Sequence, residues 1–432
     1  MIAHNRRILL LVGVAGFGGT LALAPVAACG GATAVERPAG DGGTLSEVGA
    51  MQDVPDAGSD DQSLPMVDSW VQPTPIALSL GNARSCAVDG VGAVYCWGDN
   101  FKGELGFPNS VNATIDSAAK VVGVNSVHQV AVGIVTTCAA LDDGSALCWG
   151  DGADGMMGNE TTGKSPTPVP SPTAVSMLTD VVQVAVGVGH VCARRIGGNV
   201  SCWGTDADGE IGDGKTGTGN DKLVPFEVPR LAGVIDIAAD WRHTCVVTSD
   251  GHVSCWGQED PVDGGTFNAL TPTVIPGVAD ATQVALGHDF GCALTTGGVY
   301  CWGDNTFGQL GRGNVGGTEL PAALVTGLSN ATLLAAGGNN ACALVAGGQV
   351  ACWGDNAKGE LGQGDPGFGP AAGTQSIVMQ LPAAKSVSVG ESHVCAVTRT
   401  NRAFCWGDNS AGELGSGSIG TGLGRPLPVA WQ

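Results

Sequence analysis

The three-residue motif Cys-Trp-Gly occurs seven times in this 432-residue chain, and its regular spacing constrains the fold more than any other feature. Successive copies are separated by 46 to 54 residues. Self-similarity at such a period is typical of repeat proteins, in which each unit is one small supersecondary structure that packs on its neighbours. The chain also contains 71 glycines, which indicates many tight turns between short strands. The copies begin at Cys96, Cys148, Cys202, Cys255, Cys301, Cys352 and Cys405.

A second cysteine precedes each motif, 10 residues earlier in six units and 9 residues earlier in the fifth. Strand-forming residues flank a turn between the two cysteines, so each segment predicts a hairpin with its cysteines directly opposite each other. Directly opposed residues lie about 4.5–5.5 Å apart at Cα, within disulfide range. The sequence therefore predicts seven disulfides within units. The partners of the seven motif cysteines are Cys86, Cys138, Cys192, Cys245, Cys292, Cys342 and Cys395.

The hairpin loops agree with this pairing. A spacing of 10 leaves a three-residue loop, which usually ends in a residue with left-handed backbone geometry. Glycine, or asparagine as the second choice, tolerates that geometry. The fifth pair instead leaves the two-residue loop Thr296-Gly297. The left-handed position of the other six loops is occupied by Gly92, Gly144, Gly198, Gly251, Gly348 and Asn401.

Each unit also carries an apolar strand before the first cysteine and a glycine-rich loop after Trp-Gly. The fullest loop is Asp-Asn-Thr-Phe-Gly-Gln-Leu-Gly at residues 304–311. This order of motifs resembles the regulator of chromosome condensation repeat family over residues 76–432. The resemblance implies an all-β, seven-bladed propeller with four-stranded blades. The fourth unit departs from the family pattern, because Gln258 to Phe267 lacks the Gly-Gln-Leu-Gly box.

Several structural roles follow from the repeat. The seven tryptophans are predicted to fill the core between blades, because a tryptophan buries a large apolar area. The Asp-Asn pairs, such as Asp99-Asn100, suit turn capping. The first unit begins at Ile76 with what we interpret as its later strands only. We therefore expect the C-terminal strand around Pro426–Val429 to complete the first blade and close the ring.

The first 28 residues have the pattern of a secretory signal. Arg6 and Arg7 precede an apolar stretch, and small residues precede Cys29 in an arrangement that resembles a bacterial lipobox. We expect lipidation of Cys29 and an outer-membrane or cell-surface location. The alternative is an ordinary signal peptide in which Cys29 is incidental. Residues 29–75 should form a disordered acidic linker.

Composition and motifs exclude several classes of function. The net charge of -21 argues against nucleic acid and anionic membranes as partners, so the lipid anchor would be the only membrane contact. The sequence contains no nucleophile elbow, zinc-binding helix or phosphate loop. We therefore expect a protein that is not an enzyme and has no cofactor or metal, with calcium binding by the Asp-Asn loops as the alternative. We also expect the protein to be monomeric.

The turn before each first cysteine varies among units, and seven such turns would ring one face of a propeller. Their large and polar residues resemble a binding patch in composition. For His190, His243 and His393, hydrogen bonds to neighbouring backbone are favoured over a ligand role. The Asp-Asn loops and the irregular segment Gln258–Phe267 are expected on the opposite face. The candidate binding residues are Arg84, Ile134, His190, Trp241, Arg242, His288, Phe290, Asn340, Glu391 and His393.

Three functions compete. The first is a membrane-anchored, extracytoplasmic scaffold that binds a protein. It could inhibit a secreted enzyme, since a secreted β-lactamase inhibitor shares the fold that the resemblance implies. The second is a glycan-active or glycan-binding propeller, which as an enzyme would need two carboxylates converging in one pocket. The third is nucleotide exchange on a small GTPase, or chromatin binding, as in the namesake of the family. Export and the acidic charge argue against the third.

Overall fold

The computed structural model describes residues 73–160, 168–217, 219–258, 268–364 and 369–432. These residues belong to one compact unit, Asp68–Gln432. The expected signal peptide, Cys29 and the linker up to residue 72 lie outside the described residues, as do residues 259–267 of the irregular segment in the fourth unit.

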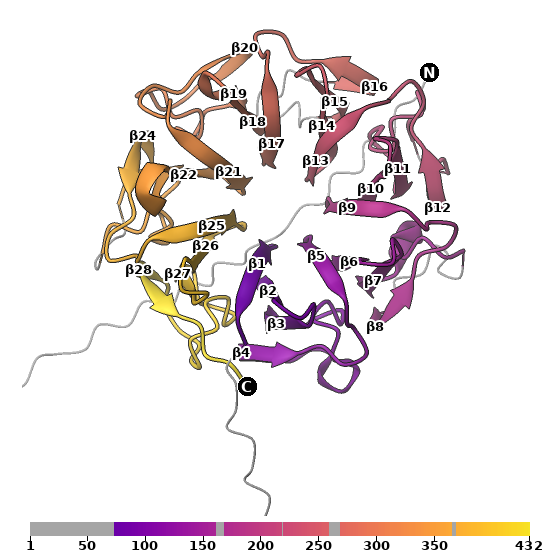
Figure 1. Ribbon diagram of the computed structural model, residues 1–432, viewed down its shortest axis with the longest axis horizontal. Helices are drawn as coiled ribbons and strands as arrows, with labels where there is room; N and C mark the ends of the chain where they lie inside the picture. The colour runs from indigo at the N-terminus through magenta and orange to yellow at the C-terminus, as the bar shows by residue number, and fades with distance from the viewer. Residues whose placement is uncertain (1–72, 161–167, 218, 259–267, 365–368) are drawn as a thin grey trace, which may run out of the picture. The chain divides into compact units, whose positions relative to one another are not determined.

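Seven antiparallel sheets of four strands each are arranged in a ring, so the predicted seven-bladed propeller is confirmed (Figure 1). Each blade uses four consecutive strands. Blade 1 consists of β1 (Pro75–Leu80), β2 (Arg84–Asp89), β3 (Val94–Asp99) and β4 (Thr114–Lys120). The first strand of a blade lies nearest the centre of the ring and the fourth lies at its outside.

The other blades repeat this plan. Blade 2 contains β5 (Val127–Val132), β6 (Thr136–Leu141), β7 (Ala146–Asp151) and β8 (Pro168–Ala174), and blade 3 contains β9 (Val181–Val186), β10 (His190–Arg195), β11 (Val200–Gly204) and β12 (Lys222–Glu227). Blade 4 contains β13 (Val234–Asp240), β14 (His243–Thr248), β15 (Val253–Gln258) and β16 (Asn268–Val274), and blade 5 contains β17 (Ala281–Gly287), β18 (Phe290–Thr295), β19 (Gly298–Asp304) and β20 (Thr318–Leu324). Blade 6 contains β21 (Ala331–Gly337), β22 (Asn340–Val345), β23 (Gln349–Gly354) and β24 (Ala372–Ile377), and blade 7 contains β25 (Ala384–Val389), β26 (His393–Thr398), β27 (Ala403–Gly407) and β28 (Leu423–Pro428).

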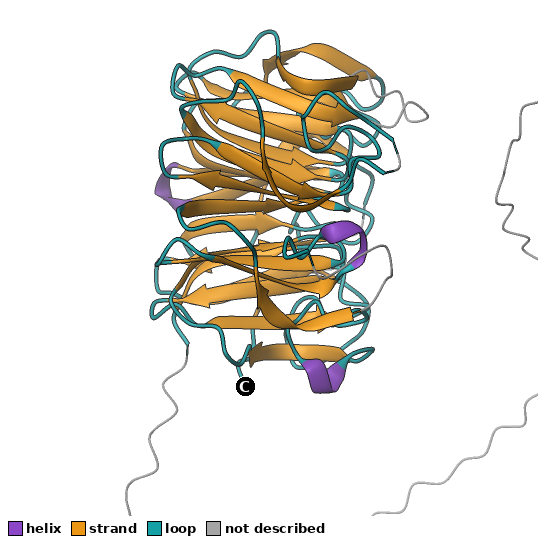
Figure 2. Cartoon of the chain, turned by 90° about the vertical axis from the view of Figure 1, so that its right-hand side faces the viewer, coloured by secondary structure: helices purple, strands orange, loops and turns teal. Residues whose placement is uncertain are grey.

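Helical structure in the described ranges is limited to three short 3-10 segments, as the side view shows (Figure 2). They are η1 (Pro108–Ser110), η2 (Ala153–Gly155) and η3 (Ala346–Gly348). Within the described part of the chain, no helix is long and apolar enough to cross a membrane.

The cysteine pairs occupy the predicted positions. In each blade the second and third strands place the two cysteines opposite each other, with Cα atoms 4.1 Å apart, and a disulfide joins them. The five predicted loop glycines have φ between +77° and +85°, and Asn401 has φ +59°. In blade 5, Thr295 pairs with Gly298, which leaves the expected two-residue loop. Seven disulfides are typical of proteins from oxidising compartments.

The core lies between neighbouring blades, and the motif tryptophans form its centre. Trp149 of blade 2, for example, packs in one cluster with Val88 and Leu105 of blade 1. The indole Nε1 of Trp203 donates to the carbonyl of Met156 at 2.9 Å, and that of Trp256 donates to Glu210 at 2.8 Å. In both cases the acceptor belongs to the preceding blade. The prediction that these tryptophans form the inter-blade core is therefore confirmed.

The expected ring closure was wrong. β28 is the fourth strand of blade 7, and blade 1 is complete without it, because the segment from Pro75 to Leu80 already supplies the innermost strand. The tail beyond β28 instead meets blade 1 at its outer strand. Ala118 donates to the carbonyl of Ala430 at 2.8 Å, and the Trp431 ring packs edge-on against Tyr95 at 5.4 Å.

Candidate functional site

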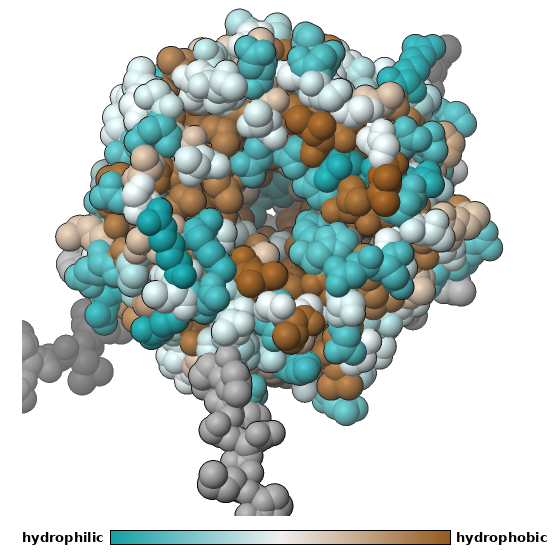
Figure 3. All heavy atoms as spheres, in the orientation of Figure 1, coloured by the Kyte–Doolittle hydropathy of each residue, from teal (hydrophilic) through white to brown (hydrophobic). Residues whose placement is uncertain are grey.

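The turns that join the first and second strands of each blade lie around the axis of the propeller at one end. We call them the turn ring, and they comprise residues 81–83, 133–135, 187–189, 241–242, 288–289, 338–339 and 390–392. The ends of the inner strands and several of these turns enclose an axial cavity of about 80 Å³. A narrow opening is visible at the centre of the ring in the space-filling view (Figure 3).

The Asp-Asn loops lie on the same face as the turn ring, which corrects the expectation that they occupy the opposite face. The backbone N–H of Asp99 donates to the carbonyl of Ala83 at 2.8 Å, and Asp304 and Asp408 make the equivalent bonds to Asp289 and Ser392. The irregular segment of blade 4 begins on this face too, since the N–H of Gln258 donates to Arg242. The reason is the antiparallel register, which places the end of the third strand beside the start of the second.

The last residue of each predicted turn is the first residue of the second strand, and its side chain is buried between blades. Within the set of candidate binding residues this applies to five. They are Arg84 at 4% exposure, Asn340 at 1%, and His190, Phe290 and His393 at 0%. For Arg84, Phe290 and Asn340, the expectation that these side chains belong to an exposed binding rim was therefore wrong. Sequence alone showed their variability but not the neighbouring blade that covers them.

The two buried histidines of this group bond to hydroxyl groups of the next blade. His190 Nε2 lies 2.8 Å from Thr244 Oγ1, and His393 Nε2 lies 2.8 Å from Ser85 Oγ. Burial lowers the pKa of His190 to about 3 and that of His393 to about 4, so both rings are neutral near pH 7. They are structural links between blades, as favoured from the sequence, although their partners are side chains.

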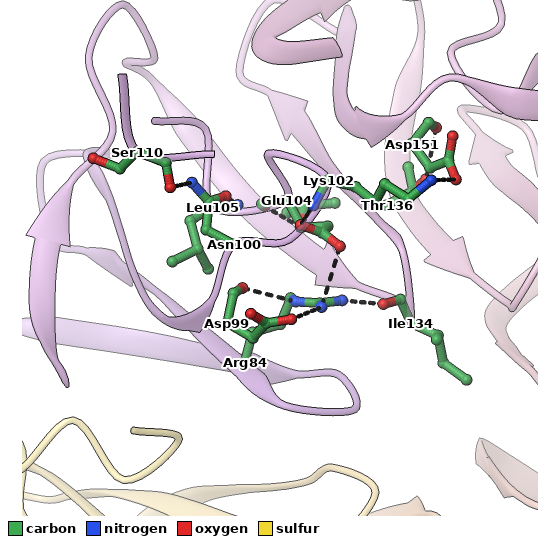
Figure 4. Close-up of polar contacts among 11 residues, drawn as sticks. Arg84, Asp99, Asn100, Lys102, Glu104, Leu105, Ser110, Ile134, Thr136 and Asp151 are labelled. Carbon is green, nitrogen blue, oxygen red and sulfur yellow. Dashed lines mark hydrogen bonds and ion pairs between the residues drawn. The ribbon is translucent and has the colours of Figure 1, made fainter. Parts of the chain in front are cut away.

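Arg84 occupies the equivalent position in blade 1 and makes an ionic link (Figure 4). Its guanidinium lies 3.2 Å from Glu104 Oε1 and 3.4 Å from Asp99 Oδ2. It also donates to the carbonyl of Ile134 in blade 2. A buried charge is tolerated when it is paired and hydrogen-bonded in this way. Arg84 is thus committed to the junction of blades 1 and 2.

The other candidate residues keep partly exposed side chains, and three of them meet. The ring centroids of Trp241 and His288 are 4.6 Å apart, and His288 Nε2 lies 2.8 Å from Glu391 Oε2. These residues come from blades 4, 5 and 7. Arg242 reaches away to Asp208 of blade 3 at 3.5 Å, and Ile134 lines the axial cavity on the far side of the ring.

His288 of blade 5 reaches Glu391 of blade 7 because the residue between them, in the turn of blade 6, is the glycine Gly338. The N–H of His288 donates to the carbonyl of Gly338 at 2.8 Å, and a Cβ at Gly338 would collide with the backbone of Glu391. Gly338 has φ +49°, a left-handed conformation that glycine adopts freely. Trp241 stands at the same turn position in blade 4 and has φ +40°. A bulky side chain in that conformation is a genuine outlier, and such strain clusters at functional sites.

Carboxylates dominate the electrostatics around His288. Burial opposes its protonation, but the contact with Glu391 and the charges of Asp240 and Asp289 raise the pKa of His288 to about 8. Burial raises the pKa of Asp240 to about 6. Asp240 Oδ1 accepts the N–H of Trp241 at 2.9 Å, whereas its Oδ2 is buried and has no hydrogen-bond partner. This part of the turn ring therefore favours positive charge.

A cavity of about 360 Å³ opens beside Trp241, and we call it the Trp241 pocket. Its walls include Trp241, His288 and Asp289 from the turn ring, Asp304 at the end of β19, and Phe307 from the loop that follows β19. The Asp304 carboxylate is held in place by Thr306 and by Gln309 Nε2 at 2.8 Å. The pocket thus combines two aromatic rings with two carboxylates.

Sequence reasoning missed the acidic members of this site. Asp240 and Asp289 adjoin the named candidates, and Asp304 and Phe307 belong to a loop that was expected on the other face. The signal that could have found two of them is the position of a carboxylate directly beside a named candidate in the sequence. Asp240 precedes Trp241, and Asp289 follows His288.

Comparison with known proteins agrees with the architecture. Human E3 ubiquitin-protein ligase HERC2 is 28% identical over 358 residues, which cover 79% of this chain but only 7% of HERC2. The ultraviolet-B receptor UVR8 of Arabidopsis thaliana is 28% identical over 364 residues, covering 82% of this chain and 80% of the receptor. Mouse regulator of chromosome condensation is 25% identical over 355 residues, with coverage of 76% and 82%.

Solved structures show the same fold. Human WBSCR16 superposes with a TM-score of 0.69 at 22% identity, covering 78% of this chain and 94% of that one. Yeast RCC1 (Prp20), solved bound to Kap60, gives a TM-score of 0.68 at 20% identity, with coverage of 83% and 85%. Residues 39–372 match the family model of the RCC1-like domain, and residues 384–413 match the regulator of chromosome condensation (RCC1) repeat. On this evidence the chain belongs to the RCC1-like domain family.

Proposed function

We propose that this chain is an exported, lipid-anchored scaffold that binds a protein partner through the turn ring. The observation that carries the proposal is Trp241. Its indole is only half-buried, and its backbone has a left-handed conformation. At the equivalent turn position of blade 6, the residue in this conformation is a glycine, Gly338. Retaining tryptophan there costs strain of about 1–3 kcal/mol. Tryptophan, with tyrosine and arginine, is also one of the side chains enriched among the energetic anchors of protein interfaces.

Two further features support this proposal. The seven disulfides suit an exported protein. The relatives are named for different activities, ubiquitin ligation and light reception among them. The same fold can therefore present different functional surfaces. Inhibition of a secreted enzyme is one form that such binding could take.

Glycan hydrolysis is supported less well. Asp240 and Glu391 both line the axial cavity and could in principle form a carboxylate pair. However, that cavity measures about 80 Å³, which leaves no room for a sugar ring between them. The arrangement suits a surface contact better than a substrate cleft.

The test uses photo-crosslinking residues placed singly in the full-length protein in its native host. A crosslinker at Val188 in the turn ring should capture the partner, whereas one at Ile196, in the hairpin turn of blade 3 at the other end, should not. With the captured partner purified, Trp241→Ala should weaken binding at least tenfold, about 1.4 kcal/mol or more. The melting temperature should remain nearly unchanged, because strain is relieved as packing is lost.

Ile196→Ala is the matched control, since it removes an exposed apolar side chain from the opposite face. The proposal is wrong if Trp241→Ala lowers the melting temperature but leaves the affinity of the folded fraction intact. It is equally wrong if crosslinks form only at the hairpin turns.

A further inference from the structure

The Trp241 pocket presents aromatic faces at the surface of an acidic protein. Trp241 and Phe307 both line it, and the Trp241 ring is held against His288 at 4.6 Å. The adjacent Arg242 is directed to Asp208 of the preceding blade and leaves the pocket to its aromatic and acidic residues. An indole face attracts cations through its negative π-surface, and tryptophan does so more strongly than the other aromatic residues.

The charges around the pocket point to the same ligand. Asp289 and Asp304 line it directly, and Asp240 and Glu391 lie next to His288 at its inner side. Three of these carboxylates, Glu391, Asp240 and Asp289, act on the imidazolium of His288. The Oδ2 atom of Asp240 is buried and has no hydrogen-bond partner. The negative potential is strong enough to hold the proton on His288 despite the burial of the ring.

We infer that the Trp241 pocket binds the guanidinium group of an arginine side chain that the protein partner inserts between blades 4 and 5. This inference rests on the proposed scaffold function and names the chemistry of the partner. A guanidinium is planar, so it can stack on the Trp241 indole while its N–H groups donate to the carboxylates of Asp289 and Asp304. The volume of about 360 Å³ accommodates the group together with its aliphatic stem.

Other occupants fit less well. A lysine ammonium would satisfy the charge but not the stacking, because it is a compact and strongly hydrated group. Within the described ranges, no group of three or more His, Cys, Asp and Glu side chains is arranged to hold a metal ion. The pocket is thus suited to an organic cation.

The experiment titrates the full-length protein, labelled with fluorinated tryptophan, with N-acetylarginine amide and follows it by fluorine NMR. Trp241→Phe assigns the Trp241 signal among the ten tryptophans. We expect a saturable shift of this signal with half-saturation at about millimolar concentration, as is usual for a ligand of this size. The isosteric but neutral N-acetylcitrulline amide should give no saturable shift, and N-acetyllysine amide should bind more weakly.

Variants separate the charge from the fold. Asp289→Asn should weaken the response at least fivefold, and it keeps the turn because asparagine tolerates the left-handed φ of +53° at this position. Asp143→Asn removes one carboxylate from an exposed hairpin of blade 2 and should leave the titration unchanged. An equal response to the citrulline compound, or a full response in Asp289→Asn, would overturn the inference.

The two proposals can fail separately. If the partner crosslinks to the turn ring but N-acetylarginine amide leaves the Trp241 signal unmoved, the arginine inference is wrong and the scaffold stands. If the arginine compound binds as described but the partner crosslinks only to the hairpin turns, the pocket is real and the proposed interface is wrong.

Discussion

His288 shows how a single residue sets the charge balance of the turn ring. Its ring contacts Trp241 on one side and Glu391 on the other, and Asp240 and Asp289 also act on it. Although burial disfavours its charge, these carboxylates raise its pKa from 6.5 to about 8. A raised folded-state pKa means that the ion pair stabilises the fold fully below about pH 6.5. This contribution is lost as the pH rises through about 8.

Glu391→Gln tests this balance. Loss of the carboxylate should lower the pKa of His288 and cost about 1–2 kcal/mol of stability near pH 6, with almost no cost near pH 9. NMR titration of the histidine rings, with His288 assigned through His288→Asn, measures the pKa directly. Urea unfolding at the two pH values measures the stability. A destabilisation of the same size at both pH values would show that Glu391 acts through packing alone.

At the scale of the structural element, the glycine-rich loops that follow the third strand of each blade show which of their atoms the fold requires. In four of these loops, the side chain of a glutamate or glutamine accepts a backbone N–H two residues earlier, while its carbonyl accepts a tryptophan indole from the next blade. They are centred on Glu210, Gln309, Glu360 and Glu413. Met156 shows that the carbonyl alone suffices for the indole. The side chain at this position is therefore free to differ in charge.

Removing the carboxylate at Glu360, or introducing one at Gln309, should change how the stability of the protein depends on pH. Burial raises the pKa of Glu360 from 4.5 to about 7. Burying the charged carboxylate therefore lowers the free energy of unfolding above about pH 7, whereas below about pH 4.5 the group is protonated and this cost is absent. Glu360→Gln should therefore stabilise the protein by about 1–3 kcal/mol at pH 8 and have little effect at pH 4.5. Gln309→Glu should do the reverse. Urea midpoints at both pH values measure the effect, and an unchanged midpoint at pH 8 in both variants would contradict it.

The disulfide hairpins give a second prediction at this scale. Peptide mapping of the unreduced protein should recover each cysteine linked to the next cysteine along the chain, from Cys86–Cys96 to Cys395–Cys405. Replacing both Cys245 and Cys255 with alanine should cost up to about 3 kcal/mol, and less where the hairpin is already paired. Free thiols in the propeller, or links between blades, would be incompatible with the observed register.

The elements that sequence predicted best are those fixed by local rules. The spacing of Cys245 and Cys255 and the left-handed Gly251 determine one hairpin without reference to the rest of the chain. The side chains of Phe290 and Asn340 were misplaced because their burial depends on the neighbouring blade, which no local pattern reveals. Asp304 and Phe307 were assigned to the wrong face for a related reason, since that assignment requires the register of three strands at once.

At the scale of the whole molecule, the site is asymmetric although the scaffold repeats. The acidic and aromatic residues of the site lie on blades 4, 5 and 7. In blade 1, by contrast, the side chain of Arg84 is buried in contacts with Glu104 and with Ile134 of blade 2. Such asymmetry within a regular ring is what a specific binding surface requires, because seven equivalent turns would offer seven equivalent and weak contacts.

The anchoring of the whole protein remains a prediction that depends on Cys29. Cys29→Ser should abolish acyl labelling and leave the protein either soluble or uncleaved, because the lipid is the expected membrane contact. Metabolic labelling with a fatty-acid analogue and fractionation of the membranes measure the two effects. Unchanged membrane retention of the cleaved variant would mean that another feature holds the protein there.

The separation of the blades along the chain has a genetic consequence. In the part of the chain that the structure describes, every sheet is made of consecutive strands and none combines strands from both ends. Each blade therefore corresponds to one continuous stretch of coding sequence. Unequal recombination between the similar repeats would therefore insert or delete a complete sheet and leave every other sheet undivided. The seam where Trp431 meets Tyr95 would have to re-form in the larger or smaller ring. A lineage with this architecture can thus change its number of blades, and with it the spacing of its surface turns, in a single mutational event.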